Sequence, residues 1–87
     1  MNKISFSPEA WEEYLYWQSQ DKKTFKKLND LIKDIMRNGT ANSGLEKTEA
    51  LKYDLSGYWS KRIDSKNRII FKVREDEIEI IRVLRPL

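Results

Sequence analysis

The sequence contains no cysteine and no histidine, and it has only three glycines and two prolines. Without cysteine there can be no disulfide, no thiolate metal site and no cysteine nucleophile. Without histidine the chain lacks the commonest metal ligand and the commonest general acid or base. We therefore expect no metal centre and no cofactor, and any proton transfer must use other side chains.

Long apolar runs are also missing. No segment approaches the roughly 18 apolar residues that would span a membrane, and the first residues, Met1 to Pro8, have no apolar run of signal-peptide length. We therefore expect a cytoplasmic protein with no membrane role. With 87 residues, 39% of them hydrophobic, the chain can bury one modest core, so residues 1–87 are predicted to form a single domain.

Charge is distributed unevenly along the chain. The whole sequence carries 17 Lys and Arg against 14 Asp and Glu, a net charge of +3. Between residues 47 and 72, however, seven basic side chains face only three acidic ones. This local excess suits the phosphates of a nucleic acid, but a solvated sheet face would show the same pattern. The basic residues are Lys47, Lys52, Lys61, Arg62, Lys66, Arg68 and Lys72.

The first half of the chain predicts a short strand followed by two helices. Polar and apolar residues alternate from Lys3 to Phe6, and Ser7-Pro8 then supplies an N-cap and a proline at the first helical position. The first helix is predicted to reach about Gln18. Asp21 can cap a second helix, which has apolar residues at three-to-four spacing and ends at Asn38-Gly39.

The first helix has an apolar face and an acidic start. Its apolar face is predicted to contain Trp11, Tyr14, Leu15 and Trp17, and we expect Trp17 to belong to the core. The first turns contain Glu9, Glu12 and Glu13, where carboxylates are stabilised by the positive end of the helix dipole.

The second half shows a period of two, which is typical of strands. After a polar loop at residues 40–48, apolar alternation predicts strands at residues 51–55, 58–63, 69–73 and 78–84, with turns at residues 56–57, 64–67 and 74–77. The adjacent Tyr58 and Trp59 should point to opposite faces, one into the core and the other able to stack on a base. The prediction is a two-layer α+β fold: two helices packed on an antiparallel sheet, with the N-terminal strand at its edge.

Four residues in this half could carry out RNA cleavage. The reaction without a metal needs a base for the ribose 2′-OH, cations for the phosphorane oxygens, and an acid for the leaving 5′ oxygen. Glu49 is a candidate base, and Lys52, Arg62 and Arg68 are candidate cations on neighbouring strands. The strand register that would bring them together is not fixed by sequence, and each could equally be an ordinary surface charge.

Nearly the whole chain resembles the YoeB/Txe toxins of bacterial toxin–antitoxin pairs, which belong to the RelE-like superfamily of ribosome-dependent mRNA interferases. The segments that carry the resemblance are Trp-Glu-Glu-Tyr-Leu-Tyr-Trp at residues 11–17, Lys-Lys-Leu-Asn-Asp-Leu-Ile-Lys-Asp at 26–34, Glu-Ala-Leu-Lys at 49–52, Leu-Ser-Gly-Tyr-Trp-Ser-Lys-Arg-Ile at 55–63 and Arg-Ile-Ile-Phe at 68–71. The resemblance implies a RelE-like fold, a homodimer, a cognate YefM-like antitoxin as partner, and cleavage of mRNA in the ribosomal A site.

The resemblance also implies roles for single residues. Glu49 matches the general base and Arg68 the phosphate-stabilising arginine, so these two are the expected catalytic residues. Lys52 matches a lysine near the scissile phosphate and Arg62 a basic residue of the same surface. Lys61 and Arg85 complete the expected RNA-binding and phosphate-binding set.

The chain departs from the family at two places. Similar proteins end in a His-Tyr pair, with the histidine as general acid, whereas this chain ends in Pro86-Leu87, and neither residue can exchange a proton. The loop before Glu49 also lacks the two prolines usual in the family. Three readings stay open: a ribonuclease of full or reduced activity; a silent protein that binds antitoxin or ribosome without cutting RNA; and a gyrase-poisoning relative on the same fold.

Overall fold

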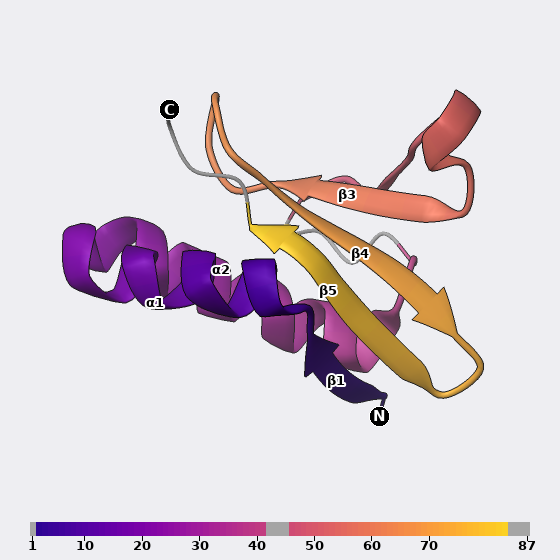
Figure 1. Ribbon diagram of the computed structural model, residues 1–87, viewed down its shortest axis with the longest axis horizontal. Helices are drawn as coiled ribbons and strands as arrows, with labels where there is room; N and C mark the ends of the chain where they lie inside the picture. Colours follow the sequence, from indigo (N-terminus) through magenta and orange to yellow (C-terminus); the bar gives the residue numbers. More distant parts are fainter. Residues whose placement is uncertain (1, 42–45, 84–87) are drawn as a thin grey trace.

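The chain forms a five-stranded mixed sheet with two helices on one of its faces (Figure 1). This computed structural model describes residues 2–41 and 46–83, and the statements below concern those residues. The elements are β1 (Lys3–Phe6), α1 (Pro8–Gln20), α2 (Lys22–Asn38), β2 (Glu49–Ala50), the 3₁₀ turn η1 (Tyr53–Leu55), β3 (Tyr58–Arg62), β4 (Arg68–Arg74) and β5 (Glu77–Val83).

The strands lie in the order β1-β5-β4-β3-β2. Strands β2 to β5 are paired antiparallel, and β1 pairs parallel with β5 at one edge of the sheet. The predicted two-layer α+β fold, with a C-terminal meander and an N-terminal edge strand, is therefore confirmed. Of the helices in the described residues, none is long and apolar enough to cross a membrane.

Both helices begin at the predicted caps. Ser7 Oγ accepts a hydrogen bond from the Ala10 N–H at 3.0 Å, with Pro8 at the first helical position. Asp21 Oδ1 accepts from the backbone of Lys23 and Thr24, and hydrogen bonds from Thr24 hold the pKa of the Asp21 carboxyl below its ordinary value. Helix α1 extends to Gln20, slightly further than predicted.

The core lies between the helices and the inner face of the sheet. Trp17 is buried there, as predicted. Tyr14 is partly buried and packs against this core, also as predicted. Two other residues of the predicted face of α1 do not: Trp11 and Leu15 are 48% and 42% exposed, while Ala10 and Glu13 are buried. The other fully buried apolar side chains come from α2 and from strands β4 and β5: Leu28, Leu31, Ile35, Ile69, Phe71, Ile78, Ile80 and Val83.

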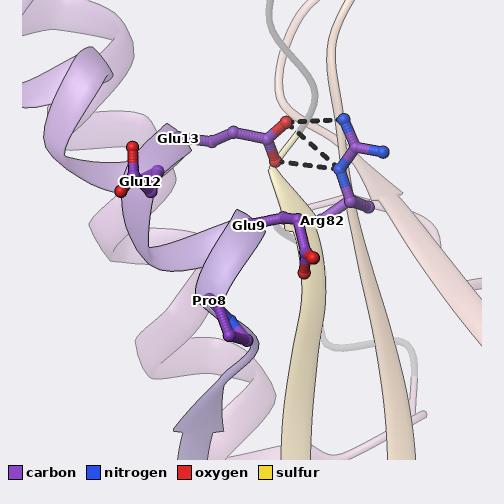
Figure 2. Close-up of a pocket in the computed structure, with 5 residues that line it drawn as sticks. All are labelled: Pro8, Glu9, Glu12, Glu13 and Arg82. Atoms are coloured by element: carbon purple, nitrogen blue, oxygen red, sulfur yellow. Dashed lines mark hydrogen bonds and ion pairs between the residues drawn. The ribbon is translucent and has the colours of Figure 1, made fainter.

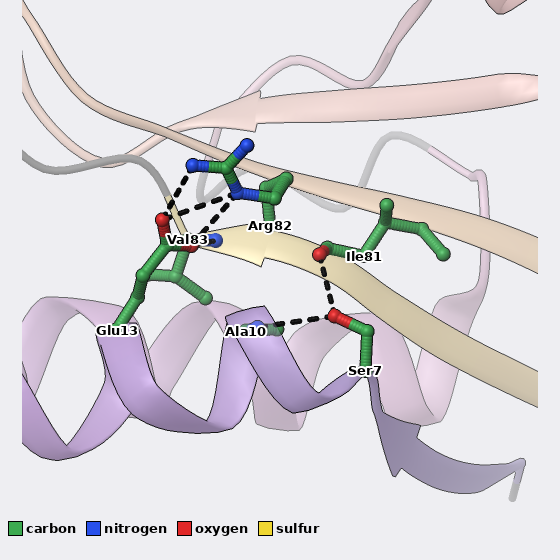
Figure 3. A network of polar contacts seen from close by, with 6 residues as sticks. All are labelled: Ser7, Ala10, Glu13, Ile81, Arg82 and Val83. Atoms are coloured by element: carbon green, nitrogen blue, oxygen red, sulfur yellow. Dashed lines mark hydrogen bonds and ion pairs between the residues drawn. The ribbon is translucent and has the colours of Figure 1, made fainter.

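The burial of Glu13 has a clear structural reason (Figure 3). Strand β1 ends at Phe6, opposite Ile80, so the last residues of β5 need other hydrogen-bond partners. Ser7 Oγ donates to the Ile81 carbonyl at 2.7 Å, and Glu13 Oε1 accepts from the Val83 N–H at 2.8 Å. Side chains from the start of α1 thus replace the missing strand.

Glu13 also forms an ion pair with Arg82, with 2.7 Å between its Oε2 and Arg82 Nη2. Arg82 Nε donates to both carboxylate oxygens as well. This contact raises the pKa of Arg82, because it favours the charged guanidinium. Sequence reasoning gave Glu13 only a helix-dipole role and missed the contact, because residues 13 and 82 lie far apart in the chain.

The prediction of a strand at residues 51–55 is wrong. Strand β2 contains only Glu49 and Ala50, and the chain then turns through η1 before entering β3. Tyr53 has a φ of +57°, in the left-handed region, which interrupts the extended backbone that alternating apolar residues suggested. The predicted turn at Ser56-Gly57 is confirmed, with φ of +94° at Gly57.

A buried ion pair joins α2 to β3. Lys61 is fully buried, and its Nζ lies 2.5 Å from Asp34 Oδ2 and 3.3 Å from the Glu46 carbonyl oxygen. Asp34 also accepts a hydrogen bond from Asn38 Nδ2. The prediction that Lys61 binds RNA is therefore wrong, because its ammonium group is enclosed by the protein and already paired.

We expect Glu13→Ala to lower the free energy of unfolding by about 2–3 kcal/mol, because it leaves the buried Val83 N–H without an acceptor and removes charge-assisted bonds to Arg82. Urea unfolding followed by tryptophan fluorescence measures the change. The matched control is Glu12→Ala, an exposed glutamate of the same helix, with an expected effect within about 0.5 kcal/mol. Equal effects of the two substitutions would contradict the role given to Glu13.

We expect Asp34→Ala to destabilise the protein by about 3–5 kcal/mol, because it leaves the Lys61 ammonium buried without its partner. Asp30→Ala, on the same helix in an exposed pair with Lys26, should cost no more than about 1 kcal/mol. Replacing both partners, as Asp34→Leu with Lys61→Met, should recover much of the loss. A double variant no more stable than Asp34→Ala would argue against the buried pair.

Candidate active site

The face of the sheet that turns away from the helices carries the candidate site. Side chains alternate along a strand, and Lys61 points toward α2, so Ser60 and Arg62 point to the opposite face. In the strand register, Glu49 lies opposite Ser60, and Arg68 lies opposite Arg62. Three strands therefore bring Glu49, Arg62 and Arg68 together on one face.

Glu49 and Arg68 form the centre of this group. Glu49 Oε1 lies 3.8 Å from Arg68 Nη1, and the same Nη1 donates a hydrogen bond to Ser60 Oγ at 3.3 Å. The Glu49 and Arg68 side chains are 49% and 38% exposed, whereas Ser60 is buried beneath them. The ion pair is longer than a hydrogen bond, so carboxylate and guanidinium both keep the capacity to bind a further group. A base and a cation thus stand side by side, open to solvent.

Arg62 and Arg68 are directly paired across β3 and β4. Like charges at opposing positions of antiparallel strands repel each other, so this arrangement does not help the sheet to form. Arg62 is exposed and makes no ion pair with the described part of the chain. An anion bound between the two guanidinium groups would relieve the repulsion, and a phosphate fits their donor geometry.

The turn between these two arginines is held by Asp64. Its Oδ1 accepts hydrogen bonds of 2.8 Å from the backbone N–H groups of Lys66 and Asn67, and the Asn67 side chain donates to both carboxylate oxygens. Burial raises the pKa of Asp64, but these hydrogen bonds outweigh it, and the net pKa is lowered. The turn, predicted from Asp64 to Asn67, therefore fixes the spacing between Arg62 and Arg68.

The remaining predicted phosphate ligands differ in what the structure says of them. Lys52 is exposed where the chain leaves β2, and it forms no ion pair with residues 2–41 or 46–83. Arg85 lies outside the described residues. Of the predicted phosphate ligands within the described residues, Lys52, Arg62 and Arg68 therefore remain available on or beside this face, whereas Lys61 is buried.

The aromatic pair in β3 divides as predicted. Trp59 is partly buried and packs against the core. Tyr58 points to the other face, where Lys72 Nζ lies 5.4 Å from the centre of its ring. Tyr58 is therefore part of the same face as Glu49 and Arg68, with a cation beside it.

A separate hollow of about 450 Å³ lies between the start of α1 and β5 (Figure 2). It is lined by Pro8, Glu9, Glu12, Glu13 and Arg82, and shares no residue with the face described above. Three carboxylates around one arginine already paired with Glu13 do not suit a phosphate. Within residues 2–41 and 46–83 no group of three Asp or Glu side chains is arranged to hold a metal ion.

Comparison with known proteins agrees with this fold. A family model described as the YoeB-like toxin of bacterial type II toxin–antitoxin systems matches residues 6–85. The chain is 46% identical over 78 residues to the toxin YoeB of Escherichia coli K12, which covers 90% of each protein.

Two solved structures from Staphylococcus aureus are similar over almost the full length. A YoeB dimer gives a TM-score of 0.85 at 41% identity, covering 99% of this chain and 98% of the other. A heterotetrameric YoeB–YefM toxin–antitoxin complex gives a TM-score of 0.87 at 40% identity, covering 100% and 99%. The resemblance seen in the sequence is confirmed: this chain belongs to the YoeB-like toxins of bacterial type II toxin–antitoxin systems.

Proposed function

We propose that this toxin is a metal-independent, ribosome-dependent endoribonuclease that cleaves mRNA in the A site. The observation that carries the proposal is the exposed pair of Glu49 and Arg68, 3.8 Å apart on a face with further cations. A carboxylate next to a guanidinium can act on a ribose hydroxyl and its neighbouring phosphate at the same time. The relatives named as YoeB toxins support the same class of activity.

The proposed reaction is an attack of the ribose 2′-OH on the adjacent phosphorus. Glu49 takes the 2′-OH proton as the new O–P bond forms, and Arg68 stabilises the charge that develops on the phosphorane oxygens. Arg62 and Lys52 add positive charge around the same phosphate. The bond from phosphorus to the 5′ oxygen then breaks, leaving a 2′,3′-cyclic phosphate and a 5′ oxygen that must gain a proton.

The source of that last proton distinguishes this chain from similar proteins. Pro86 and Leu87 stand where the family has its His-Tyr pair, and neither has a transferable proton. Loss of a general acid typically slows a reaction by about 10²- to 10⁴-fold without abolishing it. Arg85 holds its proton too tightly to replace the acid, and serves better as an electrostatic stabiliser. We therefore propose a slow ribonuclease.

A second candidate function follows from the same C-terminus. A chain that keeps the fold and the basic face but lacks a proton donor could bind antitoxin or ribosome without cutting RNA. Pro86 and Leu87 are the observation that favours this reading. The two functions differ in one measurable result, which is whether the unmodified chain cuts mRNA.

The proposed partners follow from the relatives. Staphylococcus aureus YoeB is seen as a dimer and in a complex with YefM. By analogy we propose that this toxin forms a homodimer, is neutralised by a YefM-like antitoxin, and acts on ribosomes and their mRNA in the cytoplasm.

We expect primer extension on mRNA from translating extracts to reveal A-site cuts when this toxin is added. Glu49→Ala should slow the cuts by at least about 100-fold, because it removes the base. Glu75→Ala is the matched control, an exposed glutamate in the turn before β5, and should cut like the unmodified chain. Unchanged cleavage by Glu49→Ala would rule out the proposed base.

The double substitution Pro86→His with Leu87→Tyr separates the two candidate functions. If the unmodified chain is a slow ribonuclease, the restored pair should increase an activity that is already present. If it is a silent binder, only the restored variant should cut mRNA. Absence of A-site cuts with both proteins would contradict the ribonuclease proposal.

A further inference from the structure

Tyr53 has a backbone conformation and a side-chain exposure that folding alone does not explain. Its φ of +57° makes it the only non-glycine residue in the left-handed region among those described, and its side chain is 91% exposed. A glycine or asparagine would adopt this conformation more readily than tyrosine. The ring does not offset this conformational cost by burial, because it is exposed to water rather than packed in the core.

The backbone around Tyr53 is nevertheless held in place. The Leu51 N–H donates to the Tyr58 carbonyl at 2.9 Å, and the Ser56 N–H donates to the Tyr53 carbonyl at 3.0 Å. Ala50 is in register with Trp59 at the end of β2. The short η1 turn is thus closed by its own hydrogen bond and is joined to β3 through the residues before it, and it projects beyond the sheet at the start of β3 (Figure 1). The ring is presented by a defined turn.

Tyr53 is also close to the candidate active site. It follows Glu49 by four residues, so their Cα atoms lie no more than about 14 Å apart even along a fully extended chain. This distance corresponds to a few nucleotides of a single strand, whose phosphates are about 3.4 Å apart along a stacked helix. An RNA strand with its scissile phosphate at Glu49 and Arg68 can therefore pass by the exposed ring.

The charges nearby favour RNA over an apolar protein partner. Lys52, next to Tyr53, is exposed, and the adjoining face carries Arg62 and Arg68 opposite each other. Cations that follow a backbone, together with an exposed aromatic ring, are the means by which proteins hold single-stranded nucleic acid. Asp54 is the one acidic neighbour of Tyr53 in the turn, and the exposed Lys52 offsets it.

We propose that Tyr53 stacks on a nucleobase of the mRNA within a few nucleotides of the bond that is cut, and so positions the strand for cleavage. This inference rests on the proposed ribonuclease function and adds a binding residue to it. Stacking is tolerant of sequence, since every base has a flat face, so Tyr53 should contribute to affinity more than to codon choice.

The test compares Tyr53→Phe with Tyr53→Asn in single-turnover cleavage on ribosomes programmed with a defined mRNA, over a range of toxin concentrations. Phenylalanine keeps the ring and should stay within about threefold of the unmodified chain. Asparagine loses the ring and should raise the half-saturating concentration by about 10- to 100-fold, with a smaller effect on the maximal rate. Because asparagine tolerates a positive φ, its melting temperature should not fall.

Abasic nucleotides in the mRNA identify the stacked base. They are placed one at a time near the cut. At one position the abasic nucleotide should raise the half-saturating concentration of the unmodified toxin and leave that of Tyr53→Asn unchanged. Equal losses for both proteins at every position, or an unchanged half-saturating concentration for Tyr53→Asn, would overturn the inference. A loss of affinity for the antitoxin alone in Tyr53→Asn would also overturn it, since the ring would then be a contact to a protein.

Binding separates this inference from the proposed function. If the unmodified chain does not cut mRNA, the ribonuclease proposal fails, but affinity for the same programmed ribosomes still decides the role of Tyr53. Weaker binding by Tyr53→Asn would then support stacking without cleavage. An unmodified chain that neither cuts nor binds would contradict both proposals.

Discussion

The buried ion pair between Lys61 and Asp34 is the constraint on which the candidate site depends. It turns Lys61 toward α2, and because side chains alternate along a strand, it also turns Ser60 and Arg62 to the open face. A shift of β3 by one residue would bury Arg62 and expose Lys61, and would separate Glu49 and Arg68 from their neighbours. One interior contact thus sets the arrangement of the outer face.

The pairing of the strands also sets the geometry of the candidate site. Glu49, Arg62 and Arg68 come from three adjacent strands, and sheet pairing alone sets their positions. The Asp64 turn fixes the two arginines at a distance where their charges repel, which leaves them ready to bind an anion.

Much of the fold was predictable, because its signals are local. Ser7-Pro8, Asp21 and the turn at Asp64 act through neighbouring atoms, and each is found as predicted. The predictions that failed concern contacts between residues far apart in the sequence. Lys61 reads as a surface cation until its partner 27 residues away is known, and Glu13 reads as a dipole charge until Val83 is placed beside it. Long-range pairing of polar groups leaves no trace in periodicity. The prediction of a strand through Tyr53 failed for a different reason, since the left-handed backbone of this residue contradicts the preference of tyrosine for strands.

The measurement that tests the account most directly uses a single 2′-deoxynucleotide in the mRNA. Ribosomes are programmed with two messages that differ only in whether the nucleotide before the cut carries a 2′-OH, and cleavage by this toxin is followed by primer extension. The account predicts cleavage of the all-ribose message and none at the deoxy position, because Glu49 would have no proton to remove and no nucleophile to activate. Equal cleavage of the two messages, or no cleavage of either, would contradict it.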